Sequence, residues 1–266
     1  MKEIRFADKI IRILIKDRLH YPGRLITDTV ILIARCGILL LLYYYVFKLN
    51  NGLVNGVTFG VVAWSMFFYF AFSTLRLRDI SRSIMRDVQT GNIEVFFNKP
   101  MSYLLYKTWW QVGSGLYSFL LVAIIGSLGL FLTIGIPSTM TIGIFLPTLL
   151  LVFLGASILT IIVYAIVGVL AFWIEDINPV FWLVDKAVMI LGGSYLPIAL
   201  FPVFLYKIAL YSPFGASQFI THTVNTSWRS DWYILIGIQA VWIIISGVVL
   251  FFMYSKAKRR ISVNGG

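Results

Sequence analysis

The sequence predicts an all-α protein that crosses a membrane several times, because of its composition and the position of its charges. Apolar residues make up 59% of the 266 residues and charged residues 12%, against about 45–50% and about 25% in a soluble domain. A single soluble core of this size has no room for so many apolar side chains. Composition therefore excludes a soluble enzyme, a disordered chain and a disulfide scaffold, the last also because Cys36 is the single cysteine.

Long stretches without Asp, Glu, Lys or Arg place the membrane-spanning helices. About 20 apolar residues are needed to cross about 30 Å of hydrocarbon. The uncharged stretch 108–174 is too long for one helix and has a polar break at 135–139, so it holds two. We predict a single transmembrane domain over 1–266 with six transmembrane helices, roughly at 27–47, 56–75, 104–134, 144–172, 180–200 and 232–255.

Residues 1–24 predict an amphipathic helix that lies on the membrane surface. Basic residues recur at spacings of three and four, and the apolar residues lie mostly away from that stripe. The two sets are Lys2, Arg5, Lys9, Arg12 and Lys16, and Ile4, Ile11, Leu14 and Ile15. A solvated basic tail is the alternative, and the periodic apolar positions favour the membrane surface. The turn at 21–23, Tyr-Pro-Gly, is expected to end the helix.

Positive charges are distributed unevenly between the two sides of the six-helix arrangement. Eighteen Lys and Arg residues fall on the side of the two termini and three on the other. Because cytoplasmic loops carry the excess of Lys and Arg, we predict a multi-pass protein of the cytoplasmic (inner) membrane with both termini cytoplasmic. The net charge of +11 then reflects anionic lipid headgroups, not nucleic acid. Five spans, with 187–215 looping back, would put one basic end outside and are rejected.

The cytoplasmic stretch 76–107 predicts a helix that docks onto a soluble partner. Two stripes run along it, with Arg78, Arg82 and Arg86 on one face and Ile80, Ile84 and Val88 on another. Gly91-Asn92 is a helix stop, and a short second helix follows before Lys99-Pro100. A loop that is positive merely because it is cytoplasmic explains the charge, but it does not explain the apolar patch at 93–97.

The sequence lacks the motifs of an enzyme. It has no G-x-x-x-x-G-K-[ST] phosphate loop, no H-E-x-x-H and no G-x-S-x-G. Its two histidines, His20 and His222, lie outside the predicted spans, so we predict neither a catalytic nor a metal site. Acidic residues are scarce within the spans, which argues against a proton- or sodium-coupled pump.

Three segments resemble a known family. Residues 91–106 (GNIEVFFNKPMSYLLY) resemble the loop after the second span in permease subunits of ABC transporters of the ABC-2 type. Residues 170–182 (LAFWIEDINPVFW) and 192–214 (GGSYLPIALFPVFLYKIALYSPF) resemble that family's fourth and fifth spans and the outer segment after them. The basic N-terminal helix and the six spans extend the resemblance over most of the chain.

This resemblance implies the permease subunit of an exporter, with a coupling helix within 76–101 that contacts a separate ATPase. The matching positions are Arg82, Arg86, Asp87, Gly91, Asn92, Glu94, Lys99 and Pro100. Each has a structural alternative: the arginines as lipid anchors, Gly91 as a helix cap and Pro100 as a helix stop. ATP and Mg²⁺ would bind in the ATPase subunits, with no cofactor in this chain. A second permease, identical or related, would complete the path.

The outer segment between the fifth and sixth spans carries the family's glycine, proline and phenylalanine pattern. The matching residues are Gly192, Gly193, Pro197, Phe201, Pro202, Pro213 and Phe214. The residues alone are equally compatible with an extracellular loop and with a re-entrant segment, whose loop backbone must be covered by protein. The resemblance favours re-entrant helices that cap the translocation path.

Charged residues in or near the spans need separate interpretation. Arg35 lies inside the first predicted span and is a functional candidate by default. Its position about two turns past the polar start of that span favours snorkelling or an interhelical hydrogen bond. Glu175, Asp176 and Asp185 are expected to be solvated, or to pair with Lys186 or with the ATPase.

Three other function classes stay open beside the exporter permease. The first is an ATP-independent secondary transporter or channel, the second a membrane-embedded transferase, and the third a structural assembly factor. A transferase needs convergent polar side chains facing one leaflet, which the sequence does not offer. An aromatic content of 16% suits a lipid, a drug or a peptide as substrate, and equally suits plain membrane anchoring.

Overall fold

The computed structural model describes residues 2–20, 22–97, 102–140 and 142–264, and most of them are helical. The helices are α1 (Lys2–His20), α2 (Pro22–Leu49), α3 (Phe59–Ser73), α4 (Ile80–Gln89), α5 (Ile93–Phe97), α6 (Tyr103–Thr133), α7 (Ile142–Val169), α8 (Asn178–Leu191), α9 (Val203–Tyr211), α10 (Pro213–Ala216) and α11 (Trp228–Asn264). Short 3-10 turns are η1 (Leu77–Asp79), η2 (Leu170–Phe172), η3 (Ile198–Leu200) and η4 (Phe219–Val224). The strands β1 (Leu53–Val54) and β2 (Val57–Thr58) form a small antiparallel hairpin.

Five helical segments of the described chain are long and apolar enough to cross a membrane. They are Val30–Leu49, Phe59–Gln89, Tyr103–Thr133, Gly143–Phe172 and Trp228–Arg259. The all-α, multi-pass architecture predicted from the sequence is therefore confirmed. The fifth predicted span, 180–200, coincides with α8, which has 14 residues and ends at Leu191. A helix of that length measures about 21 Å, shorter than the hydrocarbon core, so the count of six spans stays a prediction.

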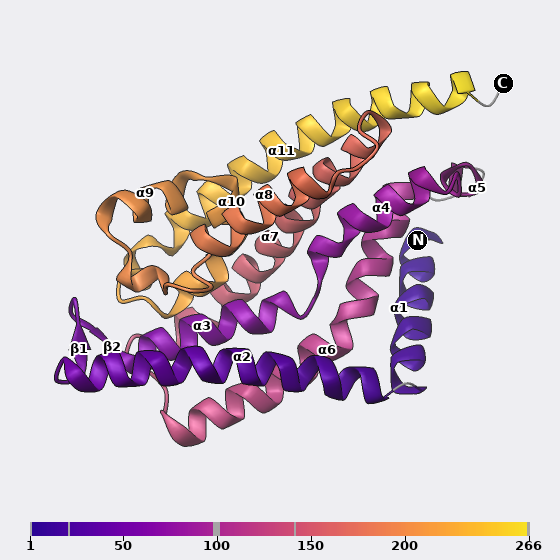
Figure 1. Cartoon of the computed structure of the whole chain (residues 1–266). Coiled ribbons are helices and arrows are strands. Elements are labelled where there is room, and N and C mark those ends of the chain that lie inside the picture. Colours follow the sequence, from indigo (N-terminus) through magenta and orange to yellow (C-terminus); the bar gives the residue numbers. More distant parts are fainter. Residues whose placement is uncertain (1, 21, 98–101, 141, 265–266) are drawn as a thin grey trace.

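The elements divide between the two ends of the helix bundle (Figure 1). Helices α1, α4 and α5 and both chain termini lie at one end, and the β1–β2 hairpin and α9 lie at the other. Helix α1 runs across the end of α2, at a steep angle to it, as a helix on a membrane surface would. Both termini at one end is the arrangement that an even number of crossings produces.

Helix α1 uses part of its apolar stripe against the bundle. Ile10 and Leu14 are buried, and α1 packs along α6. The close approach depends on Gly113 of α6, where a Cβ would lie 2.9 Å from Leu14 Cδ1 and 3.2 Å from Ile11 Cα. The surface helix predicted from the sequence is therefore also a packing partner of α6.

Helix α3 is the centre of the fold. Eleven of its 15 residues are buried, and its neighbours are α2, α6 and η4. Phe67 of α3 reaches α6 at Gly126, where any Cβ would overlap its ring. Helices α7 and α11 form a second closely packed pair. Because α3 contacts elements from both halves of the chain, it positions the two regions described next.

Candidate functional site

Helix α4 belongs to the segment expected to meet an ATPase, and it packs at the end of the bundle that holds both termini (Figure 1). It is amphipathic as predicted, and Ile80 and Ile84 are buried. Gly168 of α7 admits it, because a Cβ there would lie 2.9 Å from both Ser81 Cα and Ile84 Cδ1. The apolar face of α4 is therefore covered by the chain itself, whereas the sequence pattern had suggested a groove in a partner.

Asp87 of α4 and Lys107 of α6 form a buried ion pair. The carboxylate Oδ2 lies 2.6 Å from the ammonium Nζ, and each residue is 8% exposed. The Tyr103 hydroxyl donates a hydrogen bond to the same oxygen at 2.7 Å, and Lys107 donates one to Ser83 Oγ at 2.9 Å. The pair thus has the additional hydrogen bonds that a buried charge requires, and it ties α4 to α6.

Arg82 connects α4 to α8. Its guanidinium carbon lies 4.0 Å from the centroid of the Phe181 ring and 5.5 Å from that of Trp182. A guanidinium over an aromatic face is attracted by the negative ring quadrupole, most strongly where water is excluded. Arg82 and Asp87, both among the expected ATPase contacts, therefore point to neighbouring helices of this chain.

Asp185 of α8 forms the second link to this region. It is 3% exposed, accepts a hydrogen bond from the Tyr164 hydroxyl at 2.9 Å, and lies 3.3 Å from Arg78 Nη1. The expectation that Asp185 is solvated, or pairs with Lys186 or with the ATPase, is wrong, because Asp185 faces the interior and its partners are Tyr164 and Arg78 of this chain. Glu175 and Asp176 are exposed, as expected.

The C-terminal end of α4 and the residues that follow it, together called the tip (residues 86–95), are the part of this segment that stays open to a partner. Its exposed residues are Arg86, Gln89, Thr90, Gly91, Asn92 and Val95. Gly91 has φ +70°, a conformation that glycine adopts without strain, and it ends α4 where the sequence predicted a stop. Val95 of α5 is 61% exposed, whereas Ile93 beside it is buried.

Three of the expected ATPase contacts, Glu94, Lys99 and Pro100, lie wholly or partly outside the described residues. Glu94 lies in α5, but its side chain lies outside the described residues, as do Lys99 and Pro100. The predicted roles of these three residues therefore remain predictions.

The outer segment forms the second candidate region, because it folds back into the bundle. Residues 215–225 are all buried, and η4 within them packs against α3, α7 and α11. Hydroxyl and amide groups of the surrounding elements donate to its carbonyls: Ser65 to Thr221, Thr160 to Ser217, Gln239 to Ala216 and Thr139 to Val224, at 2.8–3.3 Å. Irregular backbone is thus satisfied by protein, which is the condition for placing it inside a membrane.

The glycines and prolines expected to shape this segment lie at its turns. Gly193, at φ +82°, reverses the chain after α8, and Gly192 lies against Gln218, whose Cγ would be 2.5 Å from an added Cβ. Pro202 directly precedes α9, and Pro213 is the first residue of α10. The remaining residues of the pattern are Pro197, which is buried, and Phe201 and Phe214, which are half-buried.

Comparison with models of known protein families assigns this multi-pass helical chain to a family. A family model described as ABC-2 family transporter protein matches residues 34–265. The chain belongs to the ABC-2 transporter family. No curated protein matches the chain. The resemblance found in the sequence is confirmed, and the chain is a multi-pass permease.

Arg35 of this ABC-2 permease donates a hydrogen bond to the turn after α8, whereas the sequence favoured snorkelling or a hydrogen bond between helices. Its Nη2 donates to the Tyr195 hydroxyl at 3.1 Å, and the guanidinium lies 5.7 Å from the centroids of Phe70 and Tyr195. Tyr43, two turns along α2, donates to the Tyr195 carbonyl at 2.7 Å. Helix α2 is thereby joined to the turn after α8.

Sequence reasoning missed the polar residues that hold these regions together. Lys107, Tyr164, Ser65, Thr160 and Gln239 are each buried, and each lies in or beside a stretch selected for its apolar character. A single polar residue inside an apolar span is the signal that could have found them. No group of three or more His, Cys, Asp or Glu side chains in the described part of this ABC-2 permease could hold a metal ion.

Proposed function

We propose that this ABC-2 permease forms the translocation path of an exporter and is driven by ATP hydrolysis in separate ATPase subunits. The observation that carries the proposal is that the body of α4 is packed against the bundle, whereas its end has several exposed side chains. The body of α4 is fixed to the bundle through Asp87 and Arg82, whereas the side chains exposed at its end and beyond it are those of Arg86, Gln89, Thr90, Asn92 and Val95. A lever of this kind passes a displacement of its free end to the helices that hold it.

The contacts define which helices would move. Asp87 connects the lever to α6, and Arg82 and Arg78 connect it to α8 through Phe181 and Asp185. Helix α8 leads directly into the outer segment that lies between α3, α7 and α11. When ATP brings two ATPases together, the tips would be displaced, and the path would change between two states whose populations the nucleotide sets.

The orientation and the second subunit belong to the same proposal. Both termini and the tip share one end of the bundle (Figure 1), and the excess of Lys and Arg on that side supports a cytoplasmic position for it, in a protein of the inner membrane. Helices α2, α6 and α11 present many exposed apolar side chains. A second permease, identical or related, would cover part of that surface and enclose the path.

The test is co-purification of the tagged chain from its host in mild detergent, followed by mass spectrometry and an ATPase assay. We expect an ATPase subunit to accompany the wild-type chain. Val95→Asp should abolish that association, because it places a charge in the exposed apolar position of the tip. The matched control is Leu53→Asp, an exposed apolar residue of β1 at the opposite end, which should leave the association unchanged.

Two results would count against the proposal. Transport that continues in Val95→Asp, or in a chain lacking residues 91–97, would remove the tip as the coupling element. A chain purified alone from several detergents, yet active in vesicles without ATP, would favour the ATP-independent transporter instead.

A further inference from the structure

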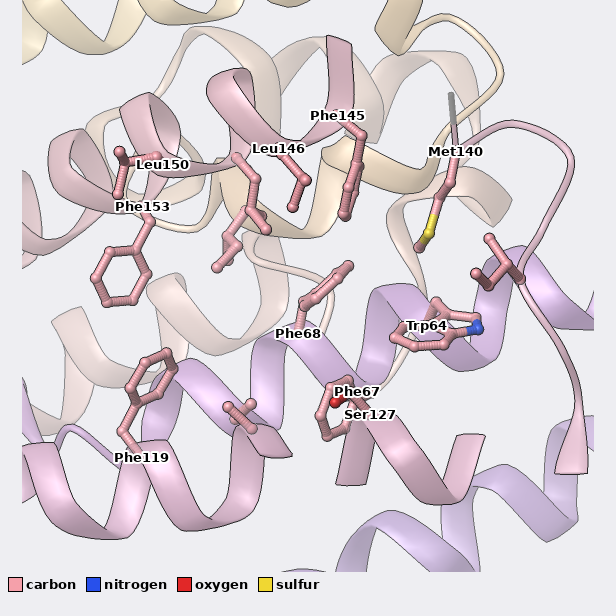
Figure 2. A pocket seen from close by; sticks show the side chains of 15 residues that line it. Trp64, Phe67, Phe68, Phe119, Ser127, Met140, Phe145, Leu146, Leu150 and Phe153 are labelled. Atoms are coloured by element: carbon pink, nitrogen blue, oxygen red, sulfur yellow. The ribbon is translucent and has the colours of Figure 1, made fainter. Parts of the chain in front are cut away.

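A cavity of about 720 Å³ lies between α3, α6 and α7 (Figure 2), and Ile220 of η4 also lines it. Aromatic side chains from all three helices line it, namely Trp64, Phe67, Phe68, Phe119, Phe145 and Phe153. Among the described residues of the lining, Ser127 is the one with a hydroxyl group, and that hydroxyl already donates to the Ile124 carbonyl at 3.2 Å. The cavity therefore offers apolar contact and almost nothing to a polar ligand.

The two ends of the cavity are defined by aromatic contacts. At one end Phe119 and Phe153 stack with their centroids 5.1 Å apart and their planes at 28°. At the other end Trp64 donates its indole N–H to the Gly135 carbonyl at 2.9 Å, beside the connection between α6 and α7. From the start of α7 to Phe153 the helix rises about 16 Å, about half of the hydrocarbon thickness. The cavity is therefore similar in length to the hydrocarbon region of one leaflet.

The side of the cavity is open to the surface that contacts lipid. Leu146 and Leu150 line it and are 59% and 60% exposed. They continue the exposed apolar face of α7, which includes Leu151 and Leu154. An unfilled apolar space would forfeit dispersion contacts on its whole lining, and water would find too few hydrogen-bond partners in it.

We propose that this cavity binds one acyl chain of a membrane phospholipid, from the leaflet that faces the connection between α6 and α7. The lining selects a hydrocarbon, the length matches a chain within one leaflet, and the open side gives access from the bilayer. The headgroup would stay outside, near the polar residues Ser138 and Thr139. This inference needs the membrane location of the helices and does not depend on an ATPase, so it can fail independently of the proposed function.

The first experiment uses the wild-type chain in nanodiscs with a trace of phosphatidylcholine that carries a diazirine. One probe has the diazirine near the carbonyl of the acyl chain and the other near the terminal methyl. After irradiation and mass spectrometry, the methyl-end probe should label residues around Phe119 and Phe153, and the carbonyl-end probe those around Ile136 and Met140. Labelling there should exceed labelling of the exposed α11 residues Phe251 and Phe252 about tenfold, which corresponds to about 1.4 kcal/mol of preference.

The second experiment fills the cavity. Ala123→Trp places a large ring in the space, and labelling should fall about tenfold. The control Ala240→Trp makes the same change on an exposed position of α11 and should leave cavity labelling unchanged. If Ala123→Trp does not fold, the difference in labelling between the two probes on the wild-type chain still tests the proposal.

Several outcomes would overturn the inference. These are equal labelling of cavity and α11, identical patterns from the two probes, and cavity residues cross-linked to a second copy of the chain. Loss of phospholipid labelling when free fatty acid is added at equal mole fraction would assign the cavity to a single-chain ligand and also overturn it. Persistence of labelling under that competition supports a phospholipid.

Discussion

Asp87 Oδ2 of α4 lies 2.6 Å from Lys107 Nζ of α6, and each residue is 8% exposed. The helix that we propose to meet the ATPase is thus joined to a membrane span by a buried ion pair. A buried pair stabilises little compared with a well-packed apolar pair, but losing one partner leaves an uncompensated charge. Removing either partner alone should therefore destabilise the protein.

Lys107→Met should destabilise the protein by about 3–5 kcal/mol, because it leaves the Asp87 carboxylate buried without its cation. Thermal unfolding in detergent measures the effect. The double variant Asp87→Leu with Lys107→Met should recover much of the loss. The exposed Lys256→Met of α11 is the matched control and should unfold like wild type. A single variant as stable as that control would show that the pair is not formed.

Gly168→Ala should separate α4 from α7. The added methyl would lie 2.9 Å from Ser81 Cα and Ile84 Cδ1, and overpacking of this kind typically costs about 1–3 kcal/mol. We expect ATP-driven transport to fall more than the amount of folded protein, because the lever is displaced. Gly247→Ala in α11, where nothing lies within 4 Å of the new Cβ, should change neither. Normal transport by Gly168→Ala would argue against a rigid lever.

The effects of substitutions at Gln239 and Gly155 on stability should not be additive, because the two residues are in contact. Gln239 donates to the Ala216 carbonyl at 3.0 Å, and its side chain fills the space where a Cβ of Gly155 would lie. Gln239→Ala should cost about 1–3 kcal/mol, because that buried carbonyl loses its donor. Gly155→Ala should destabilise the wild type but be nearly neutral in Gln239→Ala, where the space is vacant. Additive effects of the two changes in a double-mutant cycle would contradict this packing.

The proposed orientation predicts which cysteines a membrane-impermeant thiol reagent reaches in intact cells. In a Cys36→Ala background, cysteines placed at Leu53 and Thr226 should be labelled, and a cysteine at Thr90 should not. All three positions are exposed, so access to the side of the membrane decides the result. Thr90→Cys should react once the cells are permeabilised, and its labelling in intact cells would reverse the topology.

The sequence was sufficient for the architecture, because charge-free stretches of span length reflect a requirement of the bilayer. The ends of α6, Tyr103–Thr133, lie within a residue of the predicted 104–134. The amphipathic pattern of α4 and the stop at Gly91 were also legible, since both are local properties. The hairpin turn at Asn55-Gly56, with φ values of +51° and +75°, was not predicted, although Asn-Gly is typical of such turns.

The partners of the charged residues were beyond the sequence, because they are set by packing between distant segments. Asp185 pairs with Arg78 across 107 residues, and no local pattern selects that partner over the adjacent Lys186. Asp87 was predicted to contact a partner protein for the same reason. Helical spacing shows which residues share one face of a helix, but it does not show which element packs against that face. The lengths in the outer segment show the same limit, because α8 ends at Leu191, nine residues before the predicted end of the fifth span.

The carbonyls of residues 216–224 receive their donors from both earlier and later parts of the chain, and this has a consequence for biosynthesis. Ser65 and Thr160 are made before the segment, but Gln239 follows it and lies within α11. A nascent chain that ends before α11 lacks one of the groups that make this backbone tolerable away from water. The outer segment should therefore take its place late, after translation of α11, and until then it would remain at the membrane surface, open to proteases and chaperones.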